Sequence, residues 1–429
     1  MAMTVKDLRS TSPYYDAGKI QRYQALYCGG DLFRNKIDQF LIKRRSEERQ
    51  IKGLASVDMF RERAKWAQYI NRAGGLIDWF RAAVFPDLRL TVENAEDERA
   101  EYWLGLNEDA DGRGRPLAMV ARDVLVQALV HGRAYLRAHV KTEEATRSDP
   151  ESYRVWMRPL TPASVIDWSS TADDDEDLDW VKIYSALPMR SPGAVYGADA
   201  VVRHRWVVTS ETEITTYEAV QRGPQPLDEG LMVEGITRPH DFGELPIFDA
   251  RITPDQWVMD RIADVVVSLY NAEAALSYAL MMQAYAQPVF HLVDSDLSKV
   301  VVSEAHAIRL EAGEKFEYVT PPANVFEPLA SNIERLKSAF YEVLQAMAIN
   351  AASIPQAGRL SGAAVSEMRD PMKVLLTSFA SPILEVLWRW VRAVQAYRGD
   401  EDLQIEIELP AASAPDAGAL QGVIDGTQT

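Results

Sequence analysis

The residues best suited to chemistry are dispersed along this chain. Six histidines stand singly, and neither His131 nor His139 has a histidine or carboxylate beside it at the spacing of a metal site. We interpret both as core or surface histidines. Cys28 is the single cysteine, which excludes an intramolecular disulfide and any cysteine-cluster zinc or iron–sulfur site. A lone cysteine suits a reducing cytoplasm.

Familiar catalytic motifs are absent from the sequence. It contains no GxxxxGK[ST] phosphate loop, no strand-linked GxGxxG, no HExxH, no GxSxG elbow and no kinase signature. The acidic run Asp173–Asp177 suggests calcium but lacks the glycine and terminal glutamate of an EF-hand loop, so a solvated turn is the better interpretation. Carboxylates are numerous, and a hidden acid–base pair stays open. We therefore expect no catalytic residue, no cofactor, no metal site and a structural role.

Composition sets further bounds. A chain of 429 residues suggests two or three folded units. The net charge of −17 argues against a surface that grips nucleic acid or an anionic membrane. The most apolar window, Ala274–Val293, contains Gln283 and Gln287 and is broken by Pro288. It is too polar for a membrane span, and we expect no membrane contact.

The chain is organised around two long amphipathic helices. The first is predicted over Thr253–Gln287, opening on an N-cap residue followed by proline, and is about 50 Å long. Its apolar residues share one helical stripe: Val258, Ile262, Val265, Val266, Leu269, Leu276 and Leu280. Asp260, Asp264 and Asn271 lie on the opposite face.

The second helix is predicted over about Ala330–Ala352 and repeats this pattern. Its stripe is Ile333, Leu336, Phe340, Leu344 and Met347. Its polar face is Glu334, Arg335, Ser338, Glu342 and Gln345. Between the two helices, residues 288–302 and 314–322 read as short strands. Pro355 and Gly358 interrupt the segment Ser353–Leu360, and a third helix begins at Ser361, with Pro371 and Pro382 as expected kinks.

The remainder divides into a helical part and a β part. Residues 1–140 are predicted to be mainly helical, over Asp31–Lys52, Phe60–Phe85 with a weak point at Gly74-Gly75, and Leu117–Val130 running into a strand Ala134–Val140. The basic side chains of the first of these fit a solvated helix face. From residue 153 to 252 the alternation is that of half-buried strands: Tyr153–Arg158, Trp180–Tyr184, Val201–Val208 and Glu213–Val220.

The order of these segments resembles the portal proteins of tailed double-stranded-DNA bacteriophages, over about Gly243–Leu409. The features that carry the resemblance are Gly243–Ile247 before the first helix, Thr253–Asp255 at its start, the insert from Pro288, the second helix, the Pro/Gly segment Ser353–Leu360, the start Ser361–Ala364 and the kinked third helix. The resemblance implies an α+β fold in which a mixed wing domain, long stem helices and a small β-rich clip assemble as a ring of about twelve copies.

By the same resemblance, each segment has an expected place. Residues 1–252 would form the wing, 253–287 and 330–352 the stem, 288–329 the clip, 353–360 the tunnel loop and 361–409 a kinked helix with a closing strand. Residues 410–429 would be a short flexible tail without a large crown. The expected channel-facing residues are Asp260, Asp264, Asn271, Glu334 and Glu342. The tunnel loop supplies Ser353, Pro355, Gly358, Arg359 and Leu360, and the clip presents Asp294, Asp296, Lys299 and Glu304 for motor docking.

The implied function is a channel at one capsid vertex for DNA packaging and ejection. Its partners would be other copies of the chain, the terminase large subunit, a head-completion or adaptor protein, the major capsid and scaffolding proteins, and double-stranded DNA passing without sequence specificity. It would reside in the virion, and in the host cytoplasm during assembly. An acidic tunnel wall would repel phosphates and let DNA pass. Periodicity alone also fits two ordinary helices in a monomer, and two alternatives stay open: another ring-forming connector and an acidic metal-dependent hydrolase.

Overall fold

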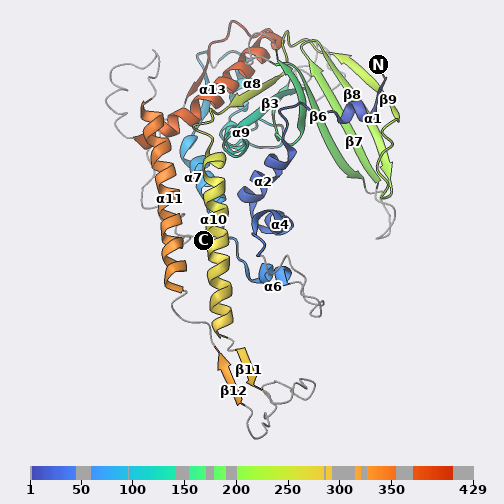
Figure 1. Cartoon of the computed structure of the whole chain (residues 1–429). Coiled ribbons are helices and arrows are strands. Elements are labelled where there is room, and N and C mark those ends of the chain that lie inside the picture. Colours follow the sequence, from blue (N-terminus) through green and yellow to red (C-terminus); the bar gives the residue numbers. More distant parts are fainter. Residues whose placement is uncertain are drawn as a thin grey trace. The chain divides into compact units, whose positions relative to one another are not determined.

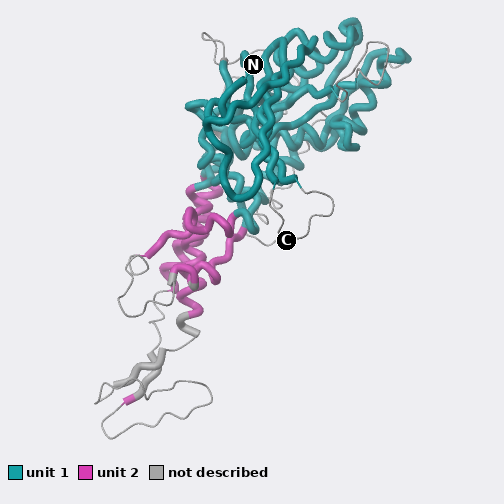
Figure 2. Tube along the Cα trace, turned by 90° about the vertical axis from the view of Figure 1, so that its right-hand side faces the viewer, with its two compact units in different colours: residues 1–32, 71–263, 343–429 teal, residues 33–70, 264–342 magenta. Residues whose placement is uncertain are grey.

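The computed structural model of the chain describes residues 2–44, 59–94, 96–140, 154–170, 178–189, 201–284, 287–291, 315–319, 326–353 and 371–408. Two compact units divide the chain (Figure 2). Unit 1 comprises residues 1–32, 71–263 and 343–429, and unit 2 comprises 33–70 and 264–342. Helices and strands are mixed, as expected of an α+β fold.

The N-terminal part is mainly helical, as predicted. Its helices are α1 (Val5–Arg9), α2 (Ala17–Cys28), α3 (Gly30–Arg34), α4 (Ile37–Phe40), α6 (Met59–Trp66), α7 (Arg72–Val84), α8 (Ala100–Gly105) and α9 (Leu117–His131). The short strands β1 (Ala2–Thr4) and β2 (Arg89–Val92) accompany them. The continuous helix predicted from Asp31 is wrong. A turn separates α3 from α4, with Lys36 N donating to Phe33 O at 3.0 Å, and it lets Phe33 and Phe40 stack at 4.4 Å.

The predicted weak point Gly74-Gly75 lies inside α7 and does not break it. The expected Phe60–Phe85 helix is interrupted earlier, between α6 and α7, where Asn71 caps α7 by accepting a hydrogen bond from Gly74 N at 2.9 Å. A Cβ on Gly74 would lie 2.5 Å from the carbonyl oxygen of Tyr27 in α2. Glycine is therefore needed at this position for the close approach of α2 and α7.

A three-stranded antiparallel sheet with the order β10-β3-β4 forms part of unit 1. Its strands are β3 (Arg133–Val140), β4 (Val155–Leu160) and β10 (Ile247–Arg251). Helix α9 ends at His131 and is capped by Gly132, whose φ of 77° turns the chain directly into β3. This confirms the predicted helix followed by a strand. A Cβ on Gly132 would meet the Trp257 indole at 2.9 Å, so a larger residue would clash as well as strain the backbone.

A six-stranded antiparallel sheet has the order β1-β9-β8-β7-β6-β5 (Figure 1). Its other strands are β5 (Val165–Ser170), β6 (Leu178–Met189), β7 (Val201–Ser210), β8 (Glu213–Arg222) and β9 (Met232–Pro239). The four strands predicted between residues 153 and 252 correspond to β4, β6, β7 and β8.

Both faces of the larger sheet bury side chains. On one face, Trp206 and Tyr217 pack with Val5 of α1. On the other, Val207 of β7 packs with Tyr135 and with Ile247 of the three-stranded sheet. The alternation along β7 thus builds two separate cores, and the second core fixes the two sheets against each other.

The last long helix, α13 (Pro371–Arg398), is a core helix of unit 1. Its segment Met372–Arg398 is long and apolar enough to cross a membrane by length and composition alone, and 56% of the window is buried inside the protein. Trp390 and Phe379 are fully buried. Pro382 lies within the helix as predicted, and Pro371 is its first described residue. The predicted closing strand is confirmed as β13 (Ile405–Glu408), which pairs with β2.

Candidate functional site

Two long helices joined through a β-hairpin form the candidate site. Helix α10 (Val258–Ala284) precedes the antiparallel strands β11 (Gln287–His291) and β12 (Lys315–Val319), and α11 (Phe326–Ser353) follows them (Figure 1). This order of helix, β-rich insert and helix confirms the sequence prediction. The two helices have 27 and 28 residues, more than twice the common length of about 11–12 residues.

The predicted start of the first helix at Thr253 is wrong, because α10 begins at Val258. Residues 253–256 instead form a turn in which Gln256 N donates to Thr253 O at 2.9 Å. Trp257 then anchors the helix start, since its Nε1 donates to Val130 O at 3.1 Å. The indole that lies over Gly132 thereby sets where the helix begins, a contact between distant residues that local sequence signals do not contain.

The apolar stripes of the two helices contact each other in unit 2. Leu269 and Ala272 of α10 pack with Ile333 of α11, and Val265, Leu276 and Leu336 are partly buried around them. Leu280, which was predicted to belong to the stripe, is 50% exposed. All five polar residues predicted to face outward from α11 are exposed: Glu334, Arg335, Ser338, Glu342 and Gln345. The spacing of residues in α11 therefore predicts its two faces correctly.

Asp260 and Asn271, both proposed channel-facing residues, have partners within the chain. Asp260 Oδ1 lies 2.7 Å from Lys19 Nζ and accepts a hydrogen bond of 2.7 Å from Tyr23 Oη. Partial burial raises the pKa of this carboxyl, but the hydrogen bonds and the positive charge of Lys19 outweigh burial and hold the pKa below its ordinary value. Asn271 Nδ2 donates to Phe40 O at 2.8 Å. Both residues hold the fold together in ways that the helical period did not predict.

The other proposed acids of the helix pair lie at the surface. Asp264, Glu334 and Glu342 are exposed. Glu334 pairs with Lys337 at 3.1 Å while its side chain remains 70% exposed, a geometry in which an ion pair contributes less than about 1 kcal/mol. The outer face of α11 therefore carries accessible carboxylates.

The remaining predicted site residues lie mainly outside the described part of the chain. This holds for the clip residues Asp294, Asp296, Lys299 and Glu304, for the acidic run Asp173–Asp177, and for Pro355, Gly358, Arg359, Leu360 and the expected helix start at Ser361. Ser353 is the last described residue of α11.

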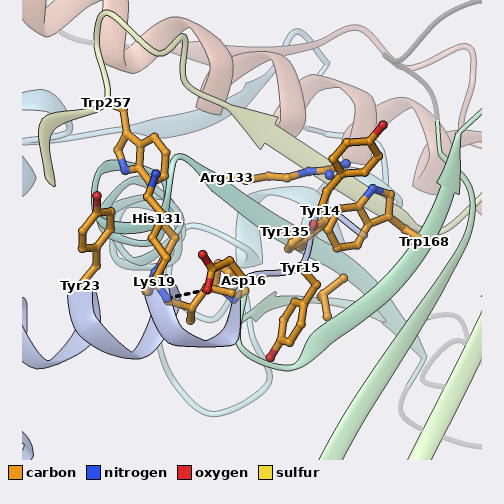
Figure 3. Close-up of a pocket in the computed structure, with 13 residues that line it drawn as sticks. Tyr14, Tyr15, Asp16, Lys19, Tyr23, His131, Arg133, Tyr135, Trp168 and Trp257 are labelled. Carbon is orange, nitrogen blue, oxygen red and sulfur yellow. Dashed lines mark hydrogen bonds between the residues drawn. The ribbon is translucent and has the colours of Figure 1, made fainter. Parts of the chain in front are cut away.

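A cavity of about 260 Å³ in unit 1 was not foreseen from the sequence (Figure 3). Aromatic rings dominate its wall: Tyr14, Tyr15, Tyr23, Tyr135, Trp168 and Trp257. Its two cations are paired, Lys19 with Asp260 as described and Arg133 with Asp249 at 2.8 Å. The cavity offers apolar surface and aromatic edges, and both of its cationic side chains are already matched by carboxylates.

One histidine of this wall is half-buried and neutral. His131 Nε2 lies 3.0 Å from Gln24 Oε1, and burial lowers the pKa of His131 to about 4. The sequence predicts no metal site at His131, because no other ligand-type residue stands at a suitable spacing from it. Among the described residues, no group of three or more histidine, cysteine or acidic side chains is arranged to hold a metal ion.

Comparisons with known proteins leave the family of this chain unassigned. No family model and no curated protein matches the sequence. A solved structure of the neck of a native gene transfer agent particle, computed with C12 symmetry, is 14% identical, with 83% of this chain and 84% of that chain covered and a TM-score of 0.36.

Two further solved structures match at the same level. The virion of a native gene transfer agent particle is 14% identical, with 87% and 88% of the two chains covered and a TM-score of 0.35. The neck of an empty particle, computed with C6 symmetry, is 15% identical, with 88% and 87% covered and a TM-score of 0.35. TM-scores this low do not establish a common fold, so function has to be argued from the site itself.

Proposed function

We propose that this chain is a portal-type connector protein. Copies form a ring at one capsid vertex, and the ring is a channel through which DNA enters and leaves the capsid. The observation that carries the proposal is the helix pair of unit 2, in which α10 and α11 bury their apolar stripes against each other through Leu269 and Ile333. Their exposed faces remain available for an aqueous channel and for neighbouring copies.

The charge on the outer face of α11 suits a conduit. Glu334 and Glu342 are exposed. Lys337 is paired with Glu334, and the exposed Arg335 donates a hydrogen bond to Asn332 Oδ1 at 2.9 Å. Repeated around an axis, such carboxylates make a wall that repels phosphates, so DNA passes without the counterion release that produces tight binding. Head-to-tail repetition of one interface around an axis closes into a ring. Asp264 belongs to the same proposal, whereas Asp260 and Asn271 already hold other parts of the chain.

The docking roles belong to the connecting segments. We assign docking of the terminase motor and of the head-completion protein to residues 288–329. This range includes β12, β11 apart from Gln287, and the candidates Asp294, Asp296, Lys299 and Glu304. Residues 353–360 are proposed to form the tunnel loop, with Arg359 as its one cation. No reaction is assigned to the chain, and ATP hydrolysis would belong to the motor.

The proposal is tested by the assembly state of the purified chain. Native mass spectrometry and negative-stain images over a range of protein concentrations should show rings of about twelve copies with an axial hole. Ile333→Asp places a charge in the buried contact between α10 and α11 and should abolish the ring. Arg335→Ala changes an exposed residue of the same helix and is the matched control. A monomer at every concentration would disprove the proposal, and a ring that does not bind a terminase would indicate a different connector.

A further inference from the structure

Two arginines lie opposite each other on strands β3 and β4 of the three-stranded sheet. The register of β3 and β4 places Arg137 directly opposite Arg158, and His139 lies two residues further along on the same face of β3. Like charges directly opposite in an antiparallel pair are destabilising. The sheet thus concentrates positive charge at one place, and the pairing of its own strands gains no stability from this arrangement.

The buried part of Arg137 has no partner. Its Nε atom is buried and makes no hydrogen bond, and burial together with the charge of Arg205 lowers the pKa of Arg137 to about 10. The same strand shows the usual arrangement at Arg133, whose guanidinium pairs with Asp249 of β10 at 2.8 Å. Across from Arg137 on β10 stands Ile247 instead, which offers no acceptor.

Further cations surround this pair. Alternation along β7 places Arg205 on the same face as Val207, which packs against the three-stranded sheet. The pKa of His139 is lowered to about 4, mainly by burial. The charges of four arginines lower it further: Arg137, Arg158, Arg205 and Arg113. We call Arg137 and Arg158 the cationic cluster, and the neutral ring of His139 lies beside them on the same face of β3.

The carboxylates near the cationic cluster are engaged elsewhere. Asp109 Oδ1 accepts from the backbone nitrogens of Arg113 and Gly114 at 3.0 and 2.9 Å. Asp111 pairs with Arg115 at 2.9 Å. On β7, Arg205 pairs with Glu218 at 3.5 Å. Within the described ranges, neither Arg137 nor Arg158 forms an ion pair with a carboxylate.

An acidic group from outside the folded chain would remove this imbalance. A buried Nε atom without an acceptor, as in the half-buried Arg137, is costly. A carboxylate held by two arginines forms strong charge-assisted hydrogen bonds. The chain has 63 acidic and 46 basic residues besides histidine, so the surface of another copy is rich in carboxylates. The same excess of acid argues against the phosphates of a nucleic acid as the partner.

We propose that the cationic cluster is an intersubunit site that binds acidic side chains of a neighbouring copy of this chain. The inference deepens the proposed ring and rests on it for the presence of that neighbour. It predicts opposite effects of one substitution on the isolated copy and on the assembly. Removing a charge relieves repulsion within a copy and removes an attraction between copies.

The test compares Arg158→Gln and the double variant Arg137→Gln/Arg158→Gln with a control, Arg89→Gln. The Arg89 side chain is 65% exposed and pairs with Asp87. Native mass spectrometry over a range of protein and salt concentrations gives the dissociation constant of the ring. We expect Arg158→Gln to raise it about ten-fold at low salt. The melting temperature of the dissociated Arg158→Gln chain should equal or exceed that of wild type. Arg89→Gln should change neither quantity.

Three outcomes would overturn the inference. If Arg158→Gln and the double variant assemble with wild-type affinity and salt dependence, the intersubunit site is disproved and the ring proposal stands. A wild-type chain that never assembles would remove both. A third outcome is that wild type binds a fluorescent DNA duplex and Arg158→Gln does not, while both assemble equally. The ligand of the cluster would then be a phosphate and not a carboxylate. If the double variant fails to fold, Arg158→Lys keeps the charge and should assemble better than Arg158→Gln.

Discussion

The side-chain amide of Asn271 in α10 holds the backbone of Ile42, with Asn271 Oδ1 accepting from Ile42 N at 2.9 Å. The other end of the same amide donates to Phe40 O at 2.8 Å and to Val267 O at 2.8 Å. One half-buried residue thus fastens the segment after α4 to α10 within unit 2. Phe33, Tyr69 and Tyr270 add ring contacts to this attachment.

Replacing Asn271 by leucine should loosen this attachment. The change removes the side-chain partners of Ile42 N and Phe40 O. Because the Ile42 end is exposed to water, we expect a cost of about 0.5–1.5 kcal/mol per hydrogen bond in the free energy of unfolding. Hydrogen exchange of the Ile42 amide should become faster. Asn271→Asp keeps the acceptor for Ile42 N and loses the donor for Phe40 O, so its Ile42 amide should exchange more slowly than in Asn271→Leu. Equal protection of this amide in wild type and Asn271→Leu would contradict the assigned role.

Gly74→Ala should destabilise the protein although alanine is the better helix former. The helix propensity gain is about 1 kcal/mol. The new Cβ would lie 2.5 Å from Tyr27 O, and overpacking of this kind costs about 1–3 kcal/mol. It would also disturb the Asn71 cap. We therefore expect a lower melting temperature by differential scanning calorimetry.

Gly105→Ala is the matched control for that experiment. Gly105 ends helix α8, and no atom outside its immediate neighbours lies within 4 Å of a Cβ built there. The substitution should be neutral or stabilising by up to about 1 kcal/mol. If both alanine variants melt alike, the close approach of α2 to α7 does not limit residue size at position 74.

The period of apolar residues predicts the two faces of α11 and most of the buried stripe of α10. It does not predict the exposure of Leu280, where α10 begins or what holds that helix. Ile333 and Glu342 follow local spacing, and both lie where the 3.6-residue period places them. The start of α10 depends on Trp257 and Val130, and the role of Asp260 depends on Lys19. These partners are far apart in the sequence, so no local pattern contains them. The sequence shows the arginines of β3 and β4 as charges on predicted strands. Only the register of the two strands shows that these arginines lie opposite each other.

The half-buried, neutral His131 predicts that the protein loses stability in mild acid. The pKa of His131 is lowered by burial to about 4, against an ordinary value of about 6.5 in an unfolded chain. Between these values the unfolded chain binds a proton that the folded chain does not. The contribution of His131 is therefore full above about pH 6.5 and falls as the pH drops toward 4, by up to about 3 kcal/mol.

His131→Gln should make the pH dependence of stability shallower. Urea unfolding at pH 7, 5.5 and 4.5 gives the free energy of unfolding, and the wild type should lose more of it on acidification than the variant. His139, whose pKa also lies at about 4 through burial and nearby arginines, adds to the loss in the same range. Combining His139→Gln with His131→Gln should therefore reduce this loss of stability further. A variant that loses as much stability as the wild type would show that His131 does not titrate in this range.

The acidic face of α11 gives a prediction specific to the channel. In Glu334→Lys/Glu342→Lys, two exposed carboxylates become ammonium groups, and the repulsion of phosphates turns into attraction at every copy of the ring. Because both side chains are exposed, the ring should assemble and melt as in wild type. Fluorescence anisotropy should show DNA binding that weakens steeply with salt, and DNA translocation through the ring should slow. Gln345→Lys, an exposed position of the same helix without a carboxylate to reverse, controls for added lysine. Equal, weak DNA binding by wild type and the double variant would exclude α11 from the channel wall.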